Sequence, residues 1–244
     1  MLKKFIHETR FEFPDLPLNL EGDVILIDKP YRCTSFDIVG KVKHFIRKKY
    51  NTKIKVGHAG TLDPLATGML IVCIGRFTKK IDHYQAQEKE YTGTFHLGAS
   101  TPSYDLEKPV DQTYPFEHIT EEMVQKTTLA FLGEIEQIPP QFSAVKIEGR
   151  RAYEFAREGE DIEIKAKTIT ISEFEITRFA LPEIDFRIVC SKGTYIRSIA
   201  RDFGIALQSG AYLTVLRRTR IGNFKVEEGV KMLIEEDENI TTKP

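Results

Sequence analysis

Two short stretches of the sequence combine residue types that can do chemistry. The first, KVGHAGTLDPLATGML at 55–70, contains one acidic residue, Asp63, in a turn rich in glycine and proline. The second, CSKGTYIRSIARDFG at 190–204, places Arg197 at the start of a helical pattern. A lone carboxylate can act as a covalent nucleophile, and a facing arginine keeps it ionised when a ligand excludes water. If Arg197 faces Asp63, the two side chains form one site, and the residue types alone leave this pairing open.

Other functions of the first stretch fit its residues less well. No lysine follows the glycines at the spacing of a phosphate-binding loop, and Asp63 is the one local acidic ligand for a hard cation. His58 and Asp63 could belong to the catalytic triad of a hydrolase, but the sequence offers no serine or cysteine in a nucleophile elbow to complete it. A purely structural role, in which Asp63 caps a turn before Pro64, stays open at this point. Glycines at 57, 60 and 68 favour a site, because they permit close approach to the backbone.

Strand and helix patterns flank the first stretch. VILID at 24–28 and MLIVCIG at 69–75 are short apolar runs typical of buried strands. Between them, Thr34 or Ser35 can cap a helix. Its apolar stripe consists of Ile38, Val42, Phe45 and Ile46. The basic residues on its other face and in its last turn are Lys41, Arg47, Lys48 and Lys49.

Similar patterns predict the elements around the second stretch. YTGTFHLG at 91–98 alternates like a half-buried strand, and 119–135 has the pattern of a helix. A strand and tight turn then precede a short helix that stops at Gly159. Further strands are predicted at 162–176, 184–190 and 211–216. Because these elements do not alternate regularly, we predict an α+β fold with a mixed, largely antiparallel sheet flanked by helices.

The helix of the second stretch is predicted to begin after a Thr194 cap and to carry Arg197 and Arg201 on one face. Its apolar side consists of Ile196, Ile199, Ala200, Phe203 and Leu207. A plain alternative for Arg197 is a surface ion pair with Asp202, which would contribute little to the stability of the fold.

The charges are unevenly distributed although the formal net charge is only −1. From 38 to 81 there are ten lysines and arginines and one acid, Asp63. From 186 to 226 there are eight and one acid, Asp202. One such segment is more often a solvated face, but two of them favour a surface that binds a polyanion such as nucleic acid.

Composition excludes several other classes of protein. No apolar run reaches the length of a membrane span, and the N-terminus lacks the apolar core of a secretion signal. The three cysteines are widely spaced and form neither a disulfide framework nor a zinc pattern. We expect a cytoplasmic protein with no bound metal and no membrane partner.

Four ordered blocks of the sequence resemble the bacterial tRNA pseudouridine-55 synthase family. They are GHAGTLDPLATGML, IPPQFSAVKIEGRRAYEFAREG, CSKGTYIRSIARDFG and GAYLTVLRR. The resemblance runs from about 22 to about 232 and implies one catalytic domain at 22–235. An N-terminal extension at 1–21 and a tail at 236–244 remain. About a dozen residues follow Met232, so we expect no C-terminal PUA domain.

The resemblance assigns roles to individual residues. Asp63 matches the nucleophile, which attacks either the base or the ribose C1′, and Arg197 matches its ion-pair partner. Tyr91 matches the tyrosine that stacks on the target base and assists a proton transfer. The remaining matches, which line the uridine pocket or its edge, are His58, Tyr195, Leu216 and Lys29. As contacts to the RNA backbone, we name Lys41, Arg47, Lys48, Arg217, Arg218 and Arg220.

These roles agree with the chemistry that the residue types allow. An enzyme that acts on a nucleobase must take it out of the stack, and tyrosines offer a stacking surface. An isomerisation needs no electron carrier and no second substrate, so we expect no cofactor, and the one partner we expect is the tRNA T-arm stem-loop, bound by a monomer. The alternative is an RNA chaperone that binds the tRNA elbow without catalysis.

Three positions depart from the family pattern. Arg32 stands where a glycine is usual, so a turn that needs positive φ is in question. In Thr101-Pro102-Ser103-Tyr104-Asp105, Asp105 is retained but a second Asp is missing. Glu90 precedes Tyr91 where a basic residue is usual.

Overall fold

The structure is a computed structural model that describes residues 10–12, 17–147, 149–160 and 162–235. The described residues fall into two compact units. Unit 1 comprises those up to Gln87 together with those from Arg217 onward, and unit 2 is Glu88–Leu216. Most of the predicted extension at 1–21 and all of the tail at 236–244 lie outside the described residues.

Unit 1 is built around a sheet that contains both parallel and antiparallel pairs. The strands of unit 1 are β1 (Arg10–Glu12), β2 (Gly22–Lys29), β3 (Val56–His58), β4 (Thr67–Gly75), β14 (Phe224–Lys225), β15 (Val230–Lys231), β16 (Leu233–Glu235) and the end of β13 (Ala211–Ile221). Of these, β1 and β16 form a separate two-stranded sheet. Strands β2 and β4 pair antiparallel along their whole length, and β3 adds to β4. The end of β13 runs parallel to β4, β15 runs parallel to β2, and β14 turns back antiparallel on β13.

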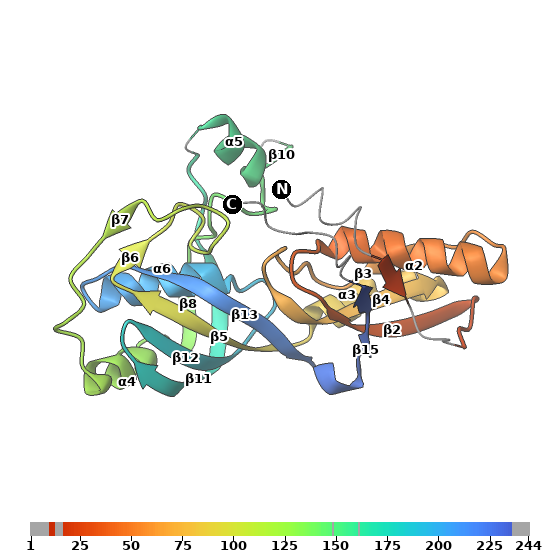
Figure 1. Cartoon of the computed structure of the whole chain (residues 1–244). Helices are drawn as coiled ribbons and strands as arrows, with labels where there is room; N and C mark the ends of the chain where they lie inside the picture. The colour runs from red at the N-terminus through yellow and green to blue at the C-terminus, as the bar shows by residue number, and fades with distance from the viewer. Residues whose placement is uncertain (1–9, 13–16, 148, 161, 236–244) are drawn as a thin grey trace. The chain divides into compact units, whose positions relative to one another are not determined.

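Helices cover both faces of the β2–β4 pair. They are α2 (Ser35–Tyr50), α3 (Ile81–Ala86) and the 3-10 turns η1 (Arg76–Lys80) and η2 (Val226–Glu228). Helix α2 lies along one face (Figure 1), where its Ile38, Val42 and Ile46 pack on strand residues of β2 and β4. On the other face, Ile81 and Tyr84 pack against a cluster that includes Met69. Burial on both faces explains why β4 is a continuous apolar run.

Segments from the two ends of the chain meet in unit 1. Strand β1 pairs antiparallel with β16, from Arg10↔Glu235 to Glu12↔Leu233. The core under α2 also takes in Leu18 and Met232. The described part of the predicted N-terminal extension is therefore built into unit 1.

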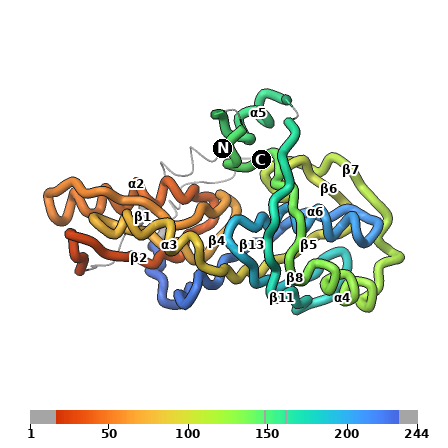
Figure 2. The backbone as a smooth tube through the Cα atoms, turned by 180° about the vertical axis from the view of Figure 1, so that it is seen from behind, coloured from red at the N-terminus to blue at the C-terminus, as the bar shows by residue number. Residues whose placement is uncertain are grey.

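Unit 2 contains a mainly antiparallel sheet. The strands of unit 2 are β5 (Lys89–Leu97), β6 (Ala99–Ser100), β7 (Gln112–Thr113), β8 (Gly133–Gln137), β9 (Lys146–Ile147), β10 (Arg150–Arg151), β11 (Lys167–Ala180), β12 (Glu183–Cys190) and the start of β13. Of these, β6 pairs with β7 and β9 with β10 in separate two-stranded sheets. Its helices are α4 (Glu121–Leu129), α5 (Ala152–Glu158) and α6 (Ile196–Ala206). The strand order is β13-β5-β12-β11-β8. Seen from behind, α4 lies beside the end of β11 (Figure 2).

Helix α6 closes the core of unit 2 with its apolar side. Phe203 is 0% exposed, and its ring centroid lies 5.3 Å from that of Phe174, 5.7 Å from that of Phe95 and 5.7 Å from that of Phe131. Phe95 also stacks on Phe186 at 4.2 Å. This aromatic cluster ties α6 to three strands, and α6 carries Arg197 in its first turn.

Most predicted elements are confirmed, including the α+β class and the mixed, largely antiparallel sheet. Thr34 caps α2, with Asp37 completing a capping box, and Gly159 ends α5 in the left-handed conformation. At the departure from the family pattern, Arg32 itself adopts a φ of 62°.

Three element predictions were wrong in their limits. The helix predicted at 119–135 ends at Leu129, and Gly133, with a φ of 87°, begins strand β8. The strand predicted at 162–176 begins at Lys167. Thr194 does not cap α6, because its hydroxyl donates to the carbonyl of Ser191. Among the described residues, no helix is both long enough and apolar enough to span a membrane.

The aromatic cluster yields a stability prediction. Phe203→Ala should lower the free energy of unfolding by about 3–5 kcal/mol, because it opens a cavity among the rings of Phe95, Phe131 and Phe174. Ile205→Ala, on the same helix but at a position 64% exposed, should change it by less than about 0.5 kcal/mol. Urea unfolding of both variants measures the difference, and equal losses would contradict this account of the core.

Candidate active site

The predicted nucleophile Asp63 lies in unit 1, in the turn that joins β3 to β4. The start of helix α2 holds this turn, because the Ser35 hydroxyl accepts from the N–H of Leu62 at 2.8 Å and donates to its carbonyl at 3.2 Å. The N–H of Ala66 donates to the carbonyl of Asp63 at 3.1 Å. The backbone on both sides of the carboxylate is therefore fixed.

Lys29 supports the same turn from strand β2. Its side chain is 0% exposed, and its ammonium group donates to the carbonyls of Cys33 at 2.7 Å, Pro30 at 3.0 Å and Pro64 at 3.5 Å. These bonds link the loop before α2 to the turn of Asp63. The resemblance matches Lys29 to a residue at the edge of the pocket, and in the structure its ammonium group holds the backbone of this turn.

Arg218 supports the turn from strand β13. It is 1% exposed, and its guanidinium donates to the carbonyls of Met69 at 2.8 Å, Gly60 at 3.1 Å and Thr61 at 3.5 Å. This burial leaves no surface for a phosphate. The predicted contact of Arg218 with the RNA backbone is therefore corrected, and the side chain is assigned to holding the turn.

Gly68 allows strand β13, which carries Arg218, to approach strand β4 closely beside Lys29. It pairs with Lys29 of β2 on one side and with Arg218 of β13 on the other. Gly68 has a φ of 105°, and a Cβ there would lie 2.2 Å from the carbonyl oxygen of Arg218. Only glycine therefore allows β13 to approach β4 this closely.

The charges in this part of unit 1 act on one another. Burial lowers the pKa of Lys29 from 10.5 to about 8, and the positive charge of Arg218 adds to the effect. Asp63 raises the pKa of Lys29, so the carboxylate and the ammonium group stabilise each other. Asp37 acts in the same direction as Asp63, although its carboxylate also completes the cap of α2.

His58, the last residue of β3, is kept neutral by its surroundings. Burial lowers its pKa, and the charge of Arg218 lowers it further. Its Nδ1 is buried and has no hydrogen-bond partner in the part of the chain that the structure describes. A neutral imidazole with one unused nitrogen fits the predicted place in the substrate pocket.

The predicted partner Arg197 lies in unit 2, in the first turn of α6, and is 4% exposed. Its Nε lies 3.6 Å from the Asp105 carboxylate, and its guanidinium donates to the carbonyls of Phe142 at 3.0 Å and Ser103 at 3.3 Å. The surface pair with Asp202 is excluded as its role, since Asp202 binds Arg201 instead. A buried arginine with a fixed orientation is suited to hold an anion.

The turn around Asp105 explains how a divergent sequence keeps this pair. Tyr104 adopts a φ of 58°, and the hydroxyls of Thr101 and Ser103 both donate to the Asp105 carbonyl. One carboxylate oxygen of Asp105 accepts from the N–H of Glu107 at 2.9 Å, and the other faces Arg197.

The other predicted pocket residues of unit 2 lie near the ends of strands and at the start of α6. Tyr91 is on β5, opposite Ile188 of β12, and is 8% exposed. Tyr195 is the N-cap residue of α6, and Leu216 is partly buried on β13. The structure thus brings Asp63, His58 and Lys29 together in unit 1, whereas the predicted contact between Asp63 and Arg197 stays a prediction.

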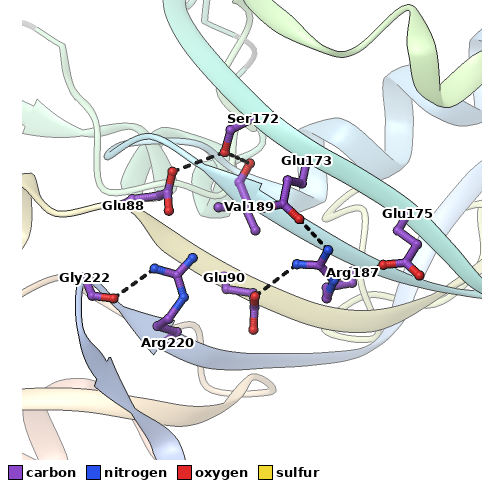
Figure 3. A network of polar contacts seen from close by, with 9 residues as sticks. All are labelled: Glu88, Glu90, Ser172, Glu173, Glu175, Arg187, Val189, Arg220 and Gly222. Carbon is purple, nitrogen blue, oxygen red and sulfur yellow. Dashed lines mark hydrogen bonds and ion pairs between the residues drawn. The ribbon is translucent and has the colours of Figure 1, made fainter.

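Part of the second basic segment is neutralised within unit 2. Arg187 on β12 donates to Glu90 at 3.1 Å, to Glu175 at 3.0 Å and to Glu173 (Figure 3). These hydrogen bonds raise the pKa of Arg187 above its ordinary value. Glu90, which departs from the family pattern, therefore has a partner in Arg187, and this arginine is engaged by acids of its own unit.

The remaining cations proposed for RNA contact differ in their surroundings. Arg47 and Lys48 are exposed in the last turn of α2, and Lys41 is half-buried. Arg217 binds Asp28 through two hydrogen bonds of 2.9 and 2.7 Å. Arg220 donates to the carbonyl of Gly222 at 2.9 Å. The exposed pair on α2 is thus the better placed for a phosphate.

Several residues that support the candidate site were not predicted from the sequence. Gln137, Lys167 and Ser103 contact the predicted site residues, but each depends on a partner far away in the sequence. Gly68 was the one signal available, as a glycine inside an apolar strand often marks a close approach. Among the described residues, no three His, Cys, Asp or Glu side chains gather as ligands for a metal ion.

Comparison with known proteins adds evidence of a different kind. Residues 47–196 match the family described as "TruB family pseudouridylate synthase (N terminal domain)". A Flavobacterium johnsoniae protein named tRNA pseudouridine synthase B is 60% identical over 220 residues, which cover 89% of this chain and 96% of that protein. A Phocaeicola vulgatus protein of the same name is 57% identical over 209 residues, 85% of this chain and 89% of that protein.

A solved structure shares the fold. It is titled "Crystal Structure of a Cbf5-Nop10-Gar1 Complex", and one of its chains matches with a TM-score of 0.64 and 28% identity. The match covers 95% of this chain and 54% of that chain, so this chain spans about half the length of its structural neighbour.

The buried Lys29 yields a prediction about pH. It titrates near pH 8 when folded and near 10.5 when unfolded, so the unfolded chain binds more protons between these values and stability rises with pH there. From about pH 7 to about pH 9.5, the wild type should gain about 2 kcal/mol of unfolding free energy relative to Lys29→Met.

Urea unfolding at both pH values measures this gain. Lys53→Met, which replaces an exposed lysine, serves as the control and should follow the wild type. An identical pH dependence for the wild type and Lys29→Met would contradict the shifted titration.

Proposed function

The chain belongs to the TruB family of pseudouridylate synthases, and we propose that it isomerises uridine 55 in the T-loop of tRNA to pseudouridine. Relatives that match along most of their length carry the name tRNA pseudouridine synthase B, which supports tRNA as the substrate. The proposed catalyst is the carboxylate of Asp63.

The observation that carries the proposal is the rigid turn around Asp63. Side chains from three elements bind its backbone: Ser35 from α2, Lys29 from β2 and Arg218 from β13. A nucleophile must be held in place before its substrate arrives, because positioning supplies much of the rate. A turn whose backbone is fixed on both sides of one carboxylate meets that requirement.

The reaction rearranges one nucleotide without any second substrate. The bond between N1 of uracil and C1′ breaks, the base turns while Asp63 holds a covalent intermediate, and C5 then bonds to C1′. The proton on C5 leaves, and N1 gains a proton, so atoms and electrons balance. The base must leave its stack, which costs a few kcal/mol that the pocket has to offset.

Residues of unit 2 supply the rest of the proposed site. Arg197 would hold Asp63 ionised, and its bonds to Asp105 and Phe142 support this role by fixing the guanidinium. Tyr91 would stack on the target base and assist the transfer of the C5 proton. Tyr195 would line the same pocket.

RNA binding outside the pocket is proposed to depend on exposed cations, chiefly Arg47 and Lys48, which would contact phosphates of the T-stem. We also propose that the protein acts as a monomer in the cytoplasm. The three cysteines are buried and none of them forms a disulfide among the described residues, which supports a reducing compartment.

Replacement of the nucleophile tests the function. Asp63→Asn should lower pseudouridine formation in a T-arm hairpin by at least about a thousandfold, because no covalent intermediate can form. Affinity for the hairpin should change by less than about threefold, since the variant keeps the shape of the turn. Release of tritium from uridine labelled at C5 measures the rate, and Asp82→Asn, an exposed acid, is the control.

Two outcomes would contradict the proposal. Normal tritium release by Asp63→Asn would remove this residue as the nucleophile. A wild type that binds the hairpin without forming pseudouridine would favour the alternative, an RNA chaperone that binds the tRNA elbow.

The dependence of RNA affinity on salt tests the phosphate contacts. Arg47→Ala combined with Lys48→Ala should reduce the slope of log Kd against log salt concentration by about 1–2. Arg217→Ala should leave the slope nearly unchanged, because Asp28 already engages that guanidinium. Lys126→Ala, on the acidic helix α4, is the control, and an equal effect at Lys126 would remove α2 from the RNA surface.

A further inference from the structure

The backbone of Tyr195 is fixed by one buried amide. Its N–H donates to Oε1 of Gln137 at 2.9 Å, and its carbonyl accepts from Nε2 of the same residue at 3.1 Å. Gln137 ends strand β8 and is 1% exposed. With the backbone held on both sides, the remaining freedom of Tyr195 is rotation of its ring.

A second residue, Lys167, covers that ring. Its ammonium nitrogen lies 4.3 Å from the centroid of the Tyr195 ring and donates a hydrogen bond to the carbonyl of Gly193. Gly193 has a φ of 81°, and a Cβ there would lie 3.4 Å from the same nitrogen. Lys167 thus packs closely on both the tyrosine and the loop that leads into α6.

The surroundings of Lys167 are unusual for a lysine. The side chain is half-buried at the start of β11, and burial lowers its pKa. Within the described ranges, no carboxylate lies at ion-pair distance from it. A cation that gives up water for a carbonyl and an aromatic face loses solvation, and lysines usually avoid such a position.

The geometry points to a role in positioning. We propose that Lys167 is a positioning residue for the reaction, which orients the Tyr195 ring by occupying one of its faces and leaves the other face for a uracil base. This inference rests on the proposed function of the Tyr195 pocket. It predicts that the ammonium group acts through Tyr195 rather than through a phosphate.

Kinetics on bound RNA test the role. Lys167→Met keeps the length of the side chain but removes the charge, and it should lower the single-turnover rate on a T-arm hairpin about tenfold. Lys167→Arg should restore the rate to within about threefold of the wild type, because it also places a cation over the ring. Lys165→Met, an exposed lysine two positions earlier, should behave as the wild type.

A double-mutant cycle tests whether Lys167 acts through the Tyr195 ring or through a phosphate of the RNA. In a Tyr195→Leu background, Lys167→Met should cost less than about twofold, since the ring it orients is gone. An equal loss in both backgrounds would overturn the inference. So would a loss of hairpin affinity with an unchanged rate for bound RNA, because it would make Lys167 a phosphate contact.

A measurement without RNA keeps this inference apart from the proposed function. In protein containing 3-fluorotyrosine, the fluorine resonance of Tyr195 is identified by its loss in Tyr195→Phe. Lys167→Met should shift this resonance, whereas Lys165→Met should not. An unshifted resonance would overturn the positioning role even in an active enzyme. A wild type that forms no pseudouridine would overturn the proposed function alone.

Discussion

Two buried cations on either side of Gly68 determine the shape of the turn that holds Asp63. An ammonium or guanidinium group without water must find acceptors, and Lys29 and Arg218 find theirs in the carbonyls of the surrounding loops. Those carbonyls include Gly60, Thr61 and Pro64 of the turn itself. The register of three strands thereby fixes where the one carboxylate of the turn lies.

This arrangement changes the interpretation of the basic segment at 38–81, in which Asp63 is the one acid. Counted along the chain, Asp63 is isolated, but Asp37 also acts on the charge of Lys29, and Asp28 pairs with Arg217, the neighbour of Arg218. Each of these two has a structural task, Asp28 with Arg217 and Asp37 in the cap of α2. The second basic segment is compensated in the same way, as the glutamates around Arg187 show. Charge counted along a sequence therefore overstates the polyanion-facing surface of a sheet protein.

The sequence predicted what depends on local pattern and missed what depends on distant partners. Apolar runs and capping residues were sufficient for β2, α2 and β4. The run at 217–220 reads as a basic patch, yet strand geometry turns alternate side chains inward, and Arg218 points into the core. The partners of Arg197 could not be predicted for a similar reason. Its guanidinium donates to the carbonyl of Ser103, which lies 94 residues earlier in the chain, in the same turn as Asp105. The helix predicted at 119–135 was too long, because the residues from Gly133 onward pair with the distant strand β11, and the local sequence pattern does not indicate this pairing.

The distribution of unit 1 between the two ends of the chain has a consequence for biosynthesis. Gly60 and the arginine that binds its carbonyl are 158 residues apart, with all of unit 2 translated between them. Strands β14, β15 and β16 follow later still. During synthesis on the ribosome, the turn around Asp63 therefore lacks its guanidinium support until β13 has emerged.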